Sequence, residues 1–228
     1  MRLKNILTAL VDLVYPRRAV CMGCGSMLGC DRDDLCEDCR KRLSERWIGP
    51  RRLQSDSGLD GAAFAYPYHG PAGSVVRNLK YAGVAVLAGQ MGTEIARAVA
   101  LLDLKDIRAV TAVPMHARRL RRRGRNHAEL LARRVAEVLG LEYMDLLYRT
   151  RNAPQQARLL PGQRRRNLKG AFAVCAASAS DVTGADILLI DDVYTTGATA
   201  RSCADALRAA GARRVYFSAY ALGEGKHG

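Results

Sequence analysis

Apolar runs that favour strands alternate with amphipathic runs that favour helices from about residue 60 to the end of the chain. The runs of apolar, often branched, residues predict strands at residues 62–66, 109–113 and 187–190. The runs with helical spacing predict helices at residues 72–81, 87–102, 126–139 and 198–210. This alternation predicts an α/β fold with a mostly parallel sheet flanked by helices, whose loops at the carboxyl edge share one site.

The chain divides into three predicted parts. Residues 1–43 are predicted to form an amino-terminal helix and a small cysteine-rich module, residues 44–60 a polar linker, and residues 61–228 the α/β domain. Within residues 3–14 the apolar positions fall on one helical face, and Asp12 interrupts the apolar run that a signal peptide needs. We therefore expect a docking helix and a cytoplasmic protein. No apolar stretch reaches the roughly 18 residues that a membrane span requires.

Positive charge is concentrated in the middle of the 228-residue chain, which has a formal net charge of +14. Residues 111–170 hold fifteen Arg and Lys side chains against four acidic ones, and the densest part is residues 118–125. Such a segment can follow the phosphates of a single-stranded nucleic acid, although residues 118–125 lack aromatic side chains for base stacking. The alternative is a solvated arginine-rich surface, since only six of the 36 basic residues are lysines.

Five of the seven cysteines lie within the first forty residues. Cys21 and Cys24 form one C-x2-C pair, and Cys36 and Cys39 form a second pair after eleven intervening residues. Two such pairs are the ligand pattern of a structural zinc site, which would stabilise a module too small to fold through an apolar core. A disulfide framework is the alternative, and it requires an oxidising compartment. The role of Cys30, as a substitute ligand or a free thiol, stays open.

The strand predicted at residues 187–190 is followed by Asp191 and Asp192, and then by Thr-Thr-Gly-Ala-Thr at residues 195–199. The threonines and the glycine lie at the predicted start of a helix, where backbone N–H groups and the helix dipole attract an anion such as phosphate. The carboxylates suit sugar hydroxyls or Mg²⁺. Because side chains alternate along a strand, we expect Asp191 and Asp192 to point to opposite faces, so that one of them faces the ligand.

This combination of apolar strand, paired acids and Thr-Thr-Gly-x-Thr resembles the phosphoribosyl pyrophosphate (PRPP) motif of type I phosphoribosyltransferases. The resemblance implies that Asp191 and Asp192 are the catalytic acids and contact the ribose hydroxyls, with Mg²⁺ bound together with PRPP. It assigns the 5′-phosphate to a loop made of Val193, Tyr194, Thr195, Thr196, Gly197, Ala198 and Thr199.

Further motifs occur in the order seen in the ComF family. They include Lys80-Tyr81-Ala82-Gly83, Val113-Pro114-Met115-His116, Arg123-Gly124-Arg125-Asn126-His127 and Arg166-Asn167-Leu168-Lys169-Gly170. The resemblance covers nearly the whole chain, and implies an amino-terminal zinc ribbon joined to a type I phosphoribosyltransferase fold and a link to natural competence and DNA uptake. It also implies a flexible loop at residues 149–169 that closes over the site. The residues assigned to the pyrophosphate site and its basic loop are Lys80, Arg118, Arg119, Arg125 and Asn126.

Three functions are compatible with the sequence. The first is a phosphoribosyltransferase, in the glycosyltransferase class, that transfers phosphoribose from PRPP to an unidentified acceptor. The second is a non-catalytic regulator that binds PRPP, and the third is an accessory protein that binds single-stranded nucleic acid. The implied partners are PRPP, single-stranded nucleic acid, and competence or DNA-processing proteins. We interpret His116 and His127 as hydrogen-bonded or anion-contacting residues rather than as general bases.

Overall fold

The computed structural model of the chain describes residues 20–28, 34–53, 57–79, 84–102, 104, 106–117, 120–121, 124–150 and 170–223. Several predicted features lie outside these residues, namely the docking helix at residues 3–14, Cys30, Lys80, Arg118, Arg119 and residues 151–169 of the predicted flexible loop.

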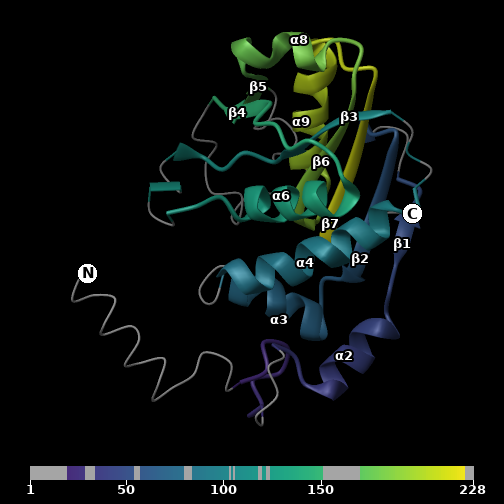
Figure 1. Ribbon diagram of the computed structural model, residues 1–228, viewed down its shortest axis with the longest axis vertical. Coiled ribbons are helices and arrows are strands. Elements are labelled where there is room, and N and C mark those ends of the chain that lie inside the picture. The colour runs from purple at the N-terminus through teal and green to yellow at the C-terminus, as the bar shows by residue number, and fades with distance from the viewer. Residues whose placement is uncertain are drawn as a thin grey trace.

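A five-stranded sheet in the order β1-β2-β7-β6-β3 forms the centre of the protein (Figure 1). Its strands are β1 (Gly49–Arg51), β2 (Gly61–Pro67), β3 (Ile107–Ala112), β6 (Asp186–Tyr194) and β7 (Arg214–Leu222). Neighbouring strands from β2 to β3 are parallel, and β1 pairs antiparallel with β2 at the edge. The mostly parallel α/β architecture that the sequence predicts is therefore confirmed.

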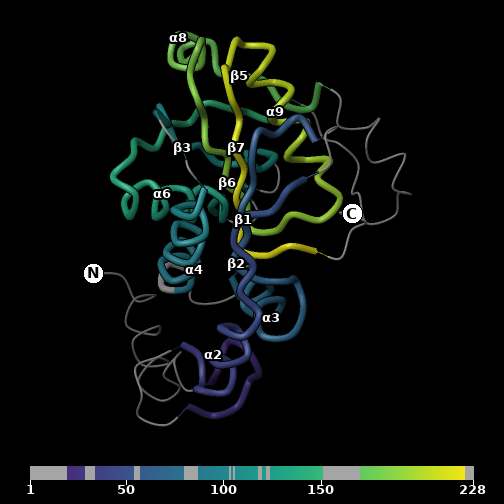
Figure 2. Tube along the Cα trace, turned by 90° about the vertical axis from the view of Figure 1, so that its right-hand side faces the viewer, coloured from purple at the N-terminus to yellow at the C-terminus, as the bar shows by residue number. Residues whose placement is uncertain are grey.

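Helices cover both faces of this sheet (Figure 2). The helices on one face are α3 (Gly70–Leu79), α4 (Val84–Val99) and α6 (His127–Leu139), and α9 (Ala198–Ala209) packs on the other. The short elements are β4 (Leu147–Arg149), β5 (Phe172–Val174), η3 (Ala176–Ser178) and α8 (Ala179–Val182). Alternation along β6 explains the two layers, because Leu188 and Ile190 join the core under α4 and α6, whereas Ile187 and Leu189 join the core under α9.

Two strands of the sheet are not anticipated by the sequence pattern. β1 lies inside residues 44–60, the predicted linker, and Gly49 pairs with Phe64 of β2. β7 is the central strand, between β2 and β6, and seven of its nine residues are buried. Its apolar run consists mainly of tyrosine, phenylalanine and alanine with a buried serine, and has only Val215 and Leu222 as branched residues, at its two ends, whereas β6 has a continuous branched run. The predicted helices begin and end within three residues of those in the structure.

The cysteine module, described at residues 20–28 and 34–46, docks on helices of the α/β domain. Its helix α2 (Glu37–Ser44) lies beside α3 (Figure 1), and Met22 and Leu43 are buried in the core shared with α3 and α4. Asn78 donates a hydrogen bond of 2.9 Å to the Met22 carbonyl, and Gln90 donates one of 3.0 Å to Asp34 Oδ2. These contacts hold the module against α3 and α4.

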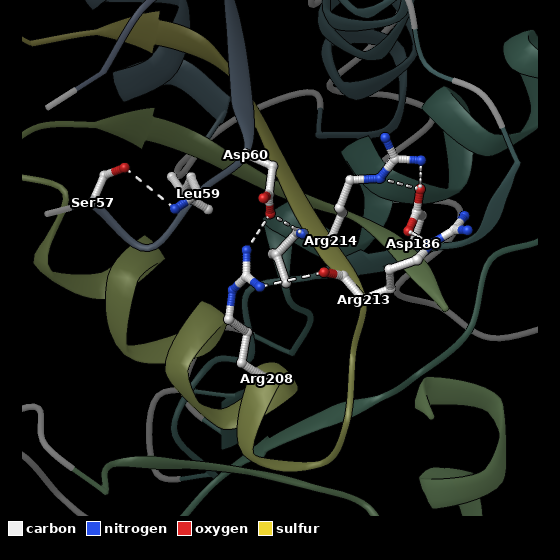
Figure 3. Close-up of polar contacts among 8 residues, drawn as sticks. Ser57, Leu59, Asp60, Asp186, Arg208, Arg213 and Arg214 are labelled. Atoms are coloured by element: carbon white, nitrogen blue, oxygen red, sulfur yellow. Dashed lines mark hydrogen bonds and ion pairs between the residues drawn. The ribbon is translucent and has the colours of Figure 1, made fainter. Parts of the chain in front are cut away.

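Ion pairs join the amino ends of the parallel strands (Figure 3). Asp186 at the start of β6 is fully buried, and accepts hydrogen bonds from Arg213 Nε at 2.7 Å and Arg214 Nε at 2.8 Å. Asp60, just before β2, pairs with Arg208 near the end of α9. This network stabilises the edge of the sheet opposite to the one that carries Asp191 and Asp192 and leaves the carboxyl edge for binding.

Candidate functional site

The acidic pair lies in the last part of β6, beyond the end of β3. The Val113 N–H donates to the Ile190 carbonyl at 2.9 Å, and Pro114 then has no N–H with which to continue the ladder. On its other side β6 remains paired with β7 as far as Tyr194. The expectation that the strand ends at Ile190 is therefore wrong, because β7 extends it through both acids. The earlier end of β3 opens a cleft beside them.

Asp191 and Asp192 both line this cleft, which has a volume of about 190 Å³. The Asp192 N–H donates a hydrogen bond of 2.8 Å to Asp191 Oδ1, which turns the Asp191 carboxylate toward its neighbour along the strand. Asp191 also lies near Cys203 of α9, where burial and then the charge of Asp191 raise the pKa of the thiol. Alternation along the strand predicts that the two side chains point to opposite faces, and both residues are part of the lining.

The turn from Thr195 to Gly197 joins β6 to α9. Gly197 has a φ of 72°, in the left-handed region, and its neighbouring helix start has no hydrogen bond from a capping side chain. The Gly223 N–H donates to the Tyr194 carbonyl at 2.6 Å and ties the turn to the end of β7. Thr195 is exposed, and Thr199 in the first turn of α9 lines the cleft. An uncapped helix start of this kind can satisfy its first N–H groups with an anion.

Three residues of the predicted phosphate loop have their side chains directed into the protein. Tyr194 is buried, with its ring centroid 5.3 Å from those of both Phe64 and Phe217. Ala198 is buried in the same core, and Val193 packs against the core on the other face. These positions can therefore contribute backbone groups to a ligand, whereas the exposed Thr196 can contribute a hydroxyl.

The opposite wall of the cleft comes from the segment after β3 and the start of α6. Its residues are Val113, Pro114, Met115, His116, Asn126, His127 and Ala128. Asn126 donates from Nδ2 to the Val113 carbonyl at 3.0 Å, so this side chain also joins the end of β3 to α6. Of the residues predicted to contact pyrophosphate, Asn126 lines the cleft. Arg125, next to it in the chain, is exposed and is not part of the lining.

Arg149 completes the cleft, although the sequence pattern does not assign it to the site. It is the last residue of β4 and pairs with Phe172 of β5, and its guanidinium carbon lies 5.3 Å from the Phe172 ring centroid. This pairing brings a positive charge to a cleft that also contains two carboxylates. The one signal in the sequence is that Arg149 begins the long basic loop.

The four predicted zinc ligands come together in the cysteine module. The Sγ atoms of Cys21, Cys24, Cys36 and Cys39 all lie within 4.8 Å of one another, and those of Cys24 and Cys36 are 3.7 Å apart. A tetrahedron with zinc–sulfur bonds of about 2.3 Å has its sulfur atoms about 3.8 Å apart, so the cluster fits a zinc ion. Backbone N–H groups of Gly23 and Cys36 donate to Cys21 Sγ at 3.3 and 3.2 Å. Such donors stabilise a thiolate ligand.

The surroundings of these thiols differ. Hydrogen bonds from the side chain and backbone of Ser26 lower the pKa of Cys24 to about 6. Burial opposes ionisation of Cys21, but hydrogen bonds from backbone N–H groups outweigh it and lower the pKa of that thiol. Burial raises the pKa of Cys39.

The first C-x2-C turn requires a glycine at position 23. A Cβ atom on Gly23 would lie 2.7 Å from Cys39 Sγ, which is too close for any other residue.

Known proteins related to this chain are found by sequence, and no family model matches it. The chain is 32% identical over 114 residues to Competence protein F of Haemophilus influenzae, covering 50% of this chain and 49% of that protein. It is 31% identical over 155 residues to the DNA utilization protein YhgH of Salmonella typhimurium, covering 65% of this chain and 66% of that protein. The chain belongs to the ComF family.

The alignments of this ComF family protein span about half of Competence protein F and just under two thirds of YhgH. It is also 36% identical over 88 residues to ribose-phosphate pyrophosphokinase of Thermococcus kodakarensis, covering 39% of this chain and 25% of that protein. The solved structure of the glutamine PRPP amidotransferase of B. subtilis is 19% identical, with a TM-score of 0.40, and covers 59% of this chain and 26% of that one. Within the described residues, no helix is both long and apolar enough to cross a membrane.

Proposed function

We propose that this ComF family protein binds PRPP with Mg²⁺ in the cleft at the end of β6 and transfers phosphoribose from it to an acceptor. The observation that carries the proposal is that Asp191, Asp192 and Thr199 line one cleft. Carboxylates that accept hydrogen bonds from ribose hydroxyls thus lie next to a helix start suited to phosphate.

In this proposal PRPP contacts two anion-binding regions of the site. The turn of Thr195–Gly197 and the start of α9 would hold the 5′-phosphate through N–H groups and the threonine hydroxyls. Asn126 and Arg149 line the same cleft as the acids and would contact the pyrophosphate. Positive charge there would stabilise the negative charge that develops on pyrophosphate as it leaves.

Asp191 and Asp192 are the described residues that would also hold Mg²⁺, since hard cations prefer carboxylate oxygens. When bound, Mg²⁺ would neutralise part of the pyrophosphate charge. The negative charge of the two carboxylates would in addition stabilise the positive charge that develops on the ribose ring as the glycosidic bond breaks.

The relatives support this assignment from two sides. The name of the ribose-phosphate pyrophosphokinase describes an enzyme that acts on ribose phosphate and pyrophosphate groups. The names of Competence protein F and YhgH connect those proteins with competence and DNA utilization. We extend both to this chain, as a PRPP-dependent protein that works with competence or DNA-processing proteins, and we propose zinc as the structural metal of its four cysteines.

Thermal unfolding with PRPP and Mg²⁺ tests the binding proposal. We expect the ligand to raise the Tm of the wild-type chain, and Asp191→Asn combined with Thr196→Ala to abolish the shift. Asp205→Asn is the matched control, because Asp205 is exposed on α9 and does not line the cleft. An unchanged shift in the double variant would count against the site. Pyrophosphate release from PRPP in a metabolite extract would then test the transfer step and lead to the acceptor.

A second candidate function concerns nucleic acid. Arg121 and Arg125 are exposed in the segment between β3 and α6, beside the cleft, and this segment carries the densest run of arginines in the sequence. Together with the DNA-related names of the relatives, this favours contact between that segment and single-stranded nucleic acid.

A further inference from the structure

A second cavity, of about 410 Å³, lies between the cysteine module and α4. Six of its lining side chains are Leu35 and Leu43 of the module, Met91 and Glu94 of α4, and Tyr66 and Tyr220 of β2 and β7. It shares no lining residue with the acid cleft. Its volume is in the range of small-molecule sites, which commonly form where two structural units meet.

The hydroxyl of Tyr220 points to a ligand in this cavity. Tyr220 is only 3% exposed, and within the described part of the chain its hydroxyl has no hydrogen-bond partner. Burial raises the pKa of this hydroxyl, so it is a protonated donor at neutral pH. The hydroxyl oxygen is accessible from the cavity, so a bound molecule or a water molecule there can accept its hydrogen bond.

The neighbouring tyrosine differs in this respect. The Tyr66 hydroxyl donates to Glu94 Oε2 at 3.0 Å, and the two tyrosine rings contact each other edge to face with centroids 5.2 Å apart. Arg97 lies 3.9 Å from the same Glu94 oxygen. Because a carboxylate can accept about four hydrogen bonds, Glu94 still has acceptor capacity toward the cavity.

The cavity therefore offers a hydrogen-bond donor, Tyr220, and an acceptor, Glu94, beside apolar side chains. Its charged lining residues balance in sign, with Asp34 and Glu94 against Arg40 and Arg97, which favours an uncharged ligand. A simple ammonium ion could not accept the hydrogen bond of Tyr220. A flat ring that carries an amino group next to a ring nitrogen meets both requirements. Its faces would contact apolar side chains such as Leu43 and Met91, which are 6% and 1% exposed.

We propose that this cavity binds an amino-substituted nitrogen heterocycle of the nucleobase or nucleoside class. The Tyr220 O–H donates to the ring nitrogen, and Glu94 accepts a hydrogen bond from the amino group. The proposal does not depend on PRPP binding, because the two cavities have separate linings. They are nevertheless close along the sheet, since Ala219, the residue before Tyr220, pairs with Asp191.

Calorimetric titration of the full chain with adenosine and cytidine tests this proposal, with inosine and uridine as matched controls. The controls replace the amino group by a carbonyl, which would face the Glu94 carboxylate, so we expect them to bind at least about tenfold more weakly. Tyr220→Phe should weaken adenosine binding about tenfold, yet should not lower the Tm, because the hydroxyl has no partner in the free protein. Ser44→Trp should block the cavity, whereas Lys41→Trp on the same helix should not.

The proposal is overturned if neither adenosine nor cytidine binds, or if inosine binds as tightly as adenosine. Unchanged adenosine binding by Tyr220→Phe would also overturn it. Loss of adenosine binding in Asp191→Asn would overturn it too, because it would assign the nucleoside to the acid cleft. A drop in Tm for Tyr220→Phe would likewise show that this hydroxyl has a structural partner. If adenosine binds and the thermal shift by PRPP is absent, the second cavity stands and the proposed function fails.

Discussion

A Cβ atom on Gly197 would lie 2.7 Å from Cζ of Tyr194. The turn before α9 therefore closes directly over the buried Tyr194 ring, which packs against Phe64 and Phe217. The φ of 72° at Gly197 is a second requirement for glycine. Through these contacts the aromatic core determines how far the proposed phosphate loop stands above the sheet.

Gly197→Ala should damage both stability and binding. Strain at positive φ together with the contact to Tyr194 should lower the free energy of unfolding by about 2 kcal/mol, and the PRPP-induced rise in Tm should disappear. Urea unfolding measures the first effect. Gly184→Ala is the control, because Gly184 has a φ of 73° with open space around its Cβ position. Equal losses in the two variants would show that the Tyr194 contact has no effect.

Asp186 should make the stability of the protein depend on pH. Burial alone would raise its pKa, but hydrogen bonds from Arg213 and Arg214 outweigh burial and lower the pKa below its ordinary value of 3.8. Because the pKa is lower in the folded state, the ionised carboxylate stabilises the protein above about pH 4. This stabilisation is lost as the pH falls through the folded-state pKa. Asp186→Asn should therefore lower the free energy of unfolding by about 2 kcal/mol at pH 7, a modest loss because both arginines keep contact with solvent. The loss should be smaller at pH 3, because less of the stabilisation by the ionised carboxylate remains in the wild type.

Unfolding free energies measured from pH 3 to pH 7 test this dependence. Asp181→Asn is a suitable control, because Asp181 pairs with Arg108 at 3.1 Å on the surface and should change the stability by less than about 1 kcal/mol. A parallel pH profile of wild type and Asp186→Asn would contradict the assigned pKa.

The cysteine module should contain one zinc ion per chain after purification without added metal. Cys36→Ser should lose the metal and unfold the module. So small a unit has too little apolar core to fold by itself, and metal binding supplies the missing stability. Cys175→Ser should keep the metal, since Cys175 lies outside the cluster. Elemental analysis measures the content, and less than about half an equivalent in the wild-type chain would favour disulfides or free thiols.

Binding of single-stranded DNA should weaken as salt increases. Counterion release predicts a slope of about −0.7 per phosphate contact in a plot of log affinity against log salt. Arg121→Ala with Arg125→Ala should make this slope shallower, whereas Arg51→Ala with Arg52→Ala, two exposed residues at and just after the end of β1, should not. Fluorescence anisotropy with an oligothymidine measures the affinity, and a flat salt dependence would contradict a phosphate-tracking role.

The sequence predicts those parts of the fold that have a strong local pattern. The branched residues of β6 and the amphipathic spacing of α6 and α9 place these elements correctly, and the two C-x2-C pairs predict the cysteine cluster. β7 is missed because its burial comes from lying between β2 and β6, which is a tertiary effect. Arg149 is missed for the same reason, since only the pairing of β4 with β5 brings it to the cleft.

The cleft beside the acids depends on tertiary structure that the sequence pattern does not contain. β7 extends β6 through Asp191 and Asp192, whereas β3 ends earlier, before Pro114, and both acidic residues line the cleft at this point. The cavity beside Tyr220 also forms from segments distant in the sequence, since the cysteine module supplies one of its walls.

The most direct test of the central claim is a crystal of the protein soaked with PRPP and Mg²⁺. We predict density for the ribose against Asp191 and Asp192, with the 5′-phosphate at the turn of Thr195–Gly197. Density for PRPP elsewhere, or a cleft filled by the protein's own side chains at saturating ligand, would contradict the proposed function.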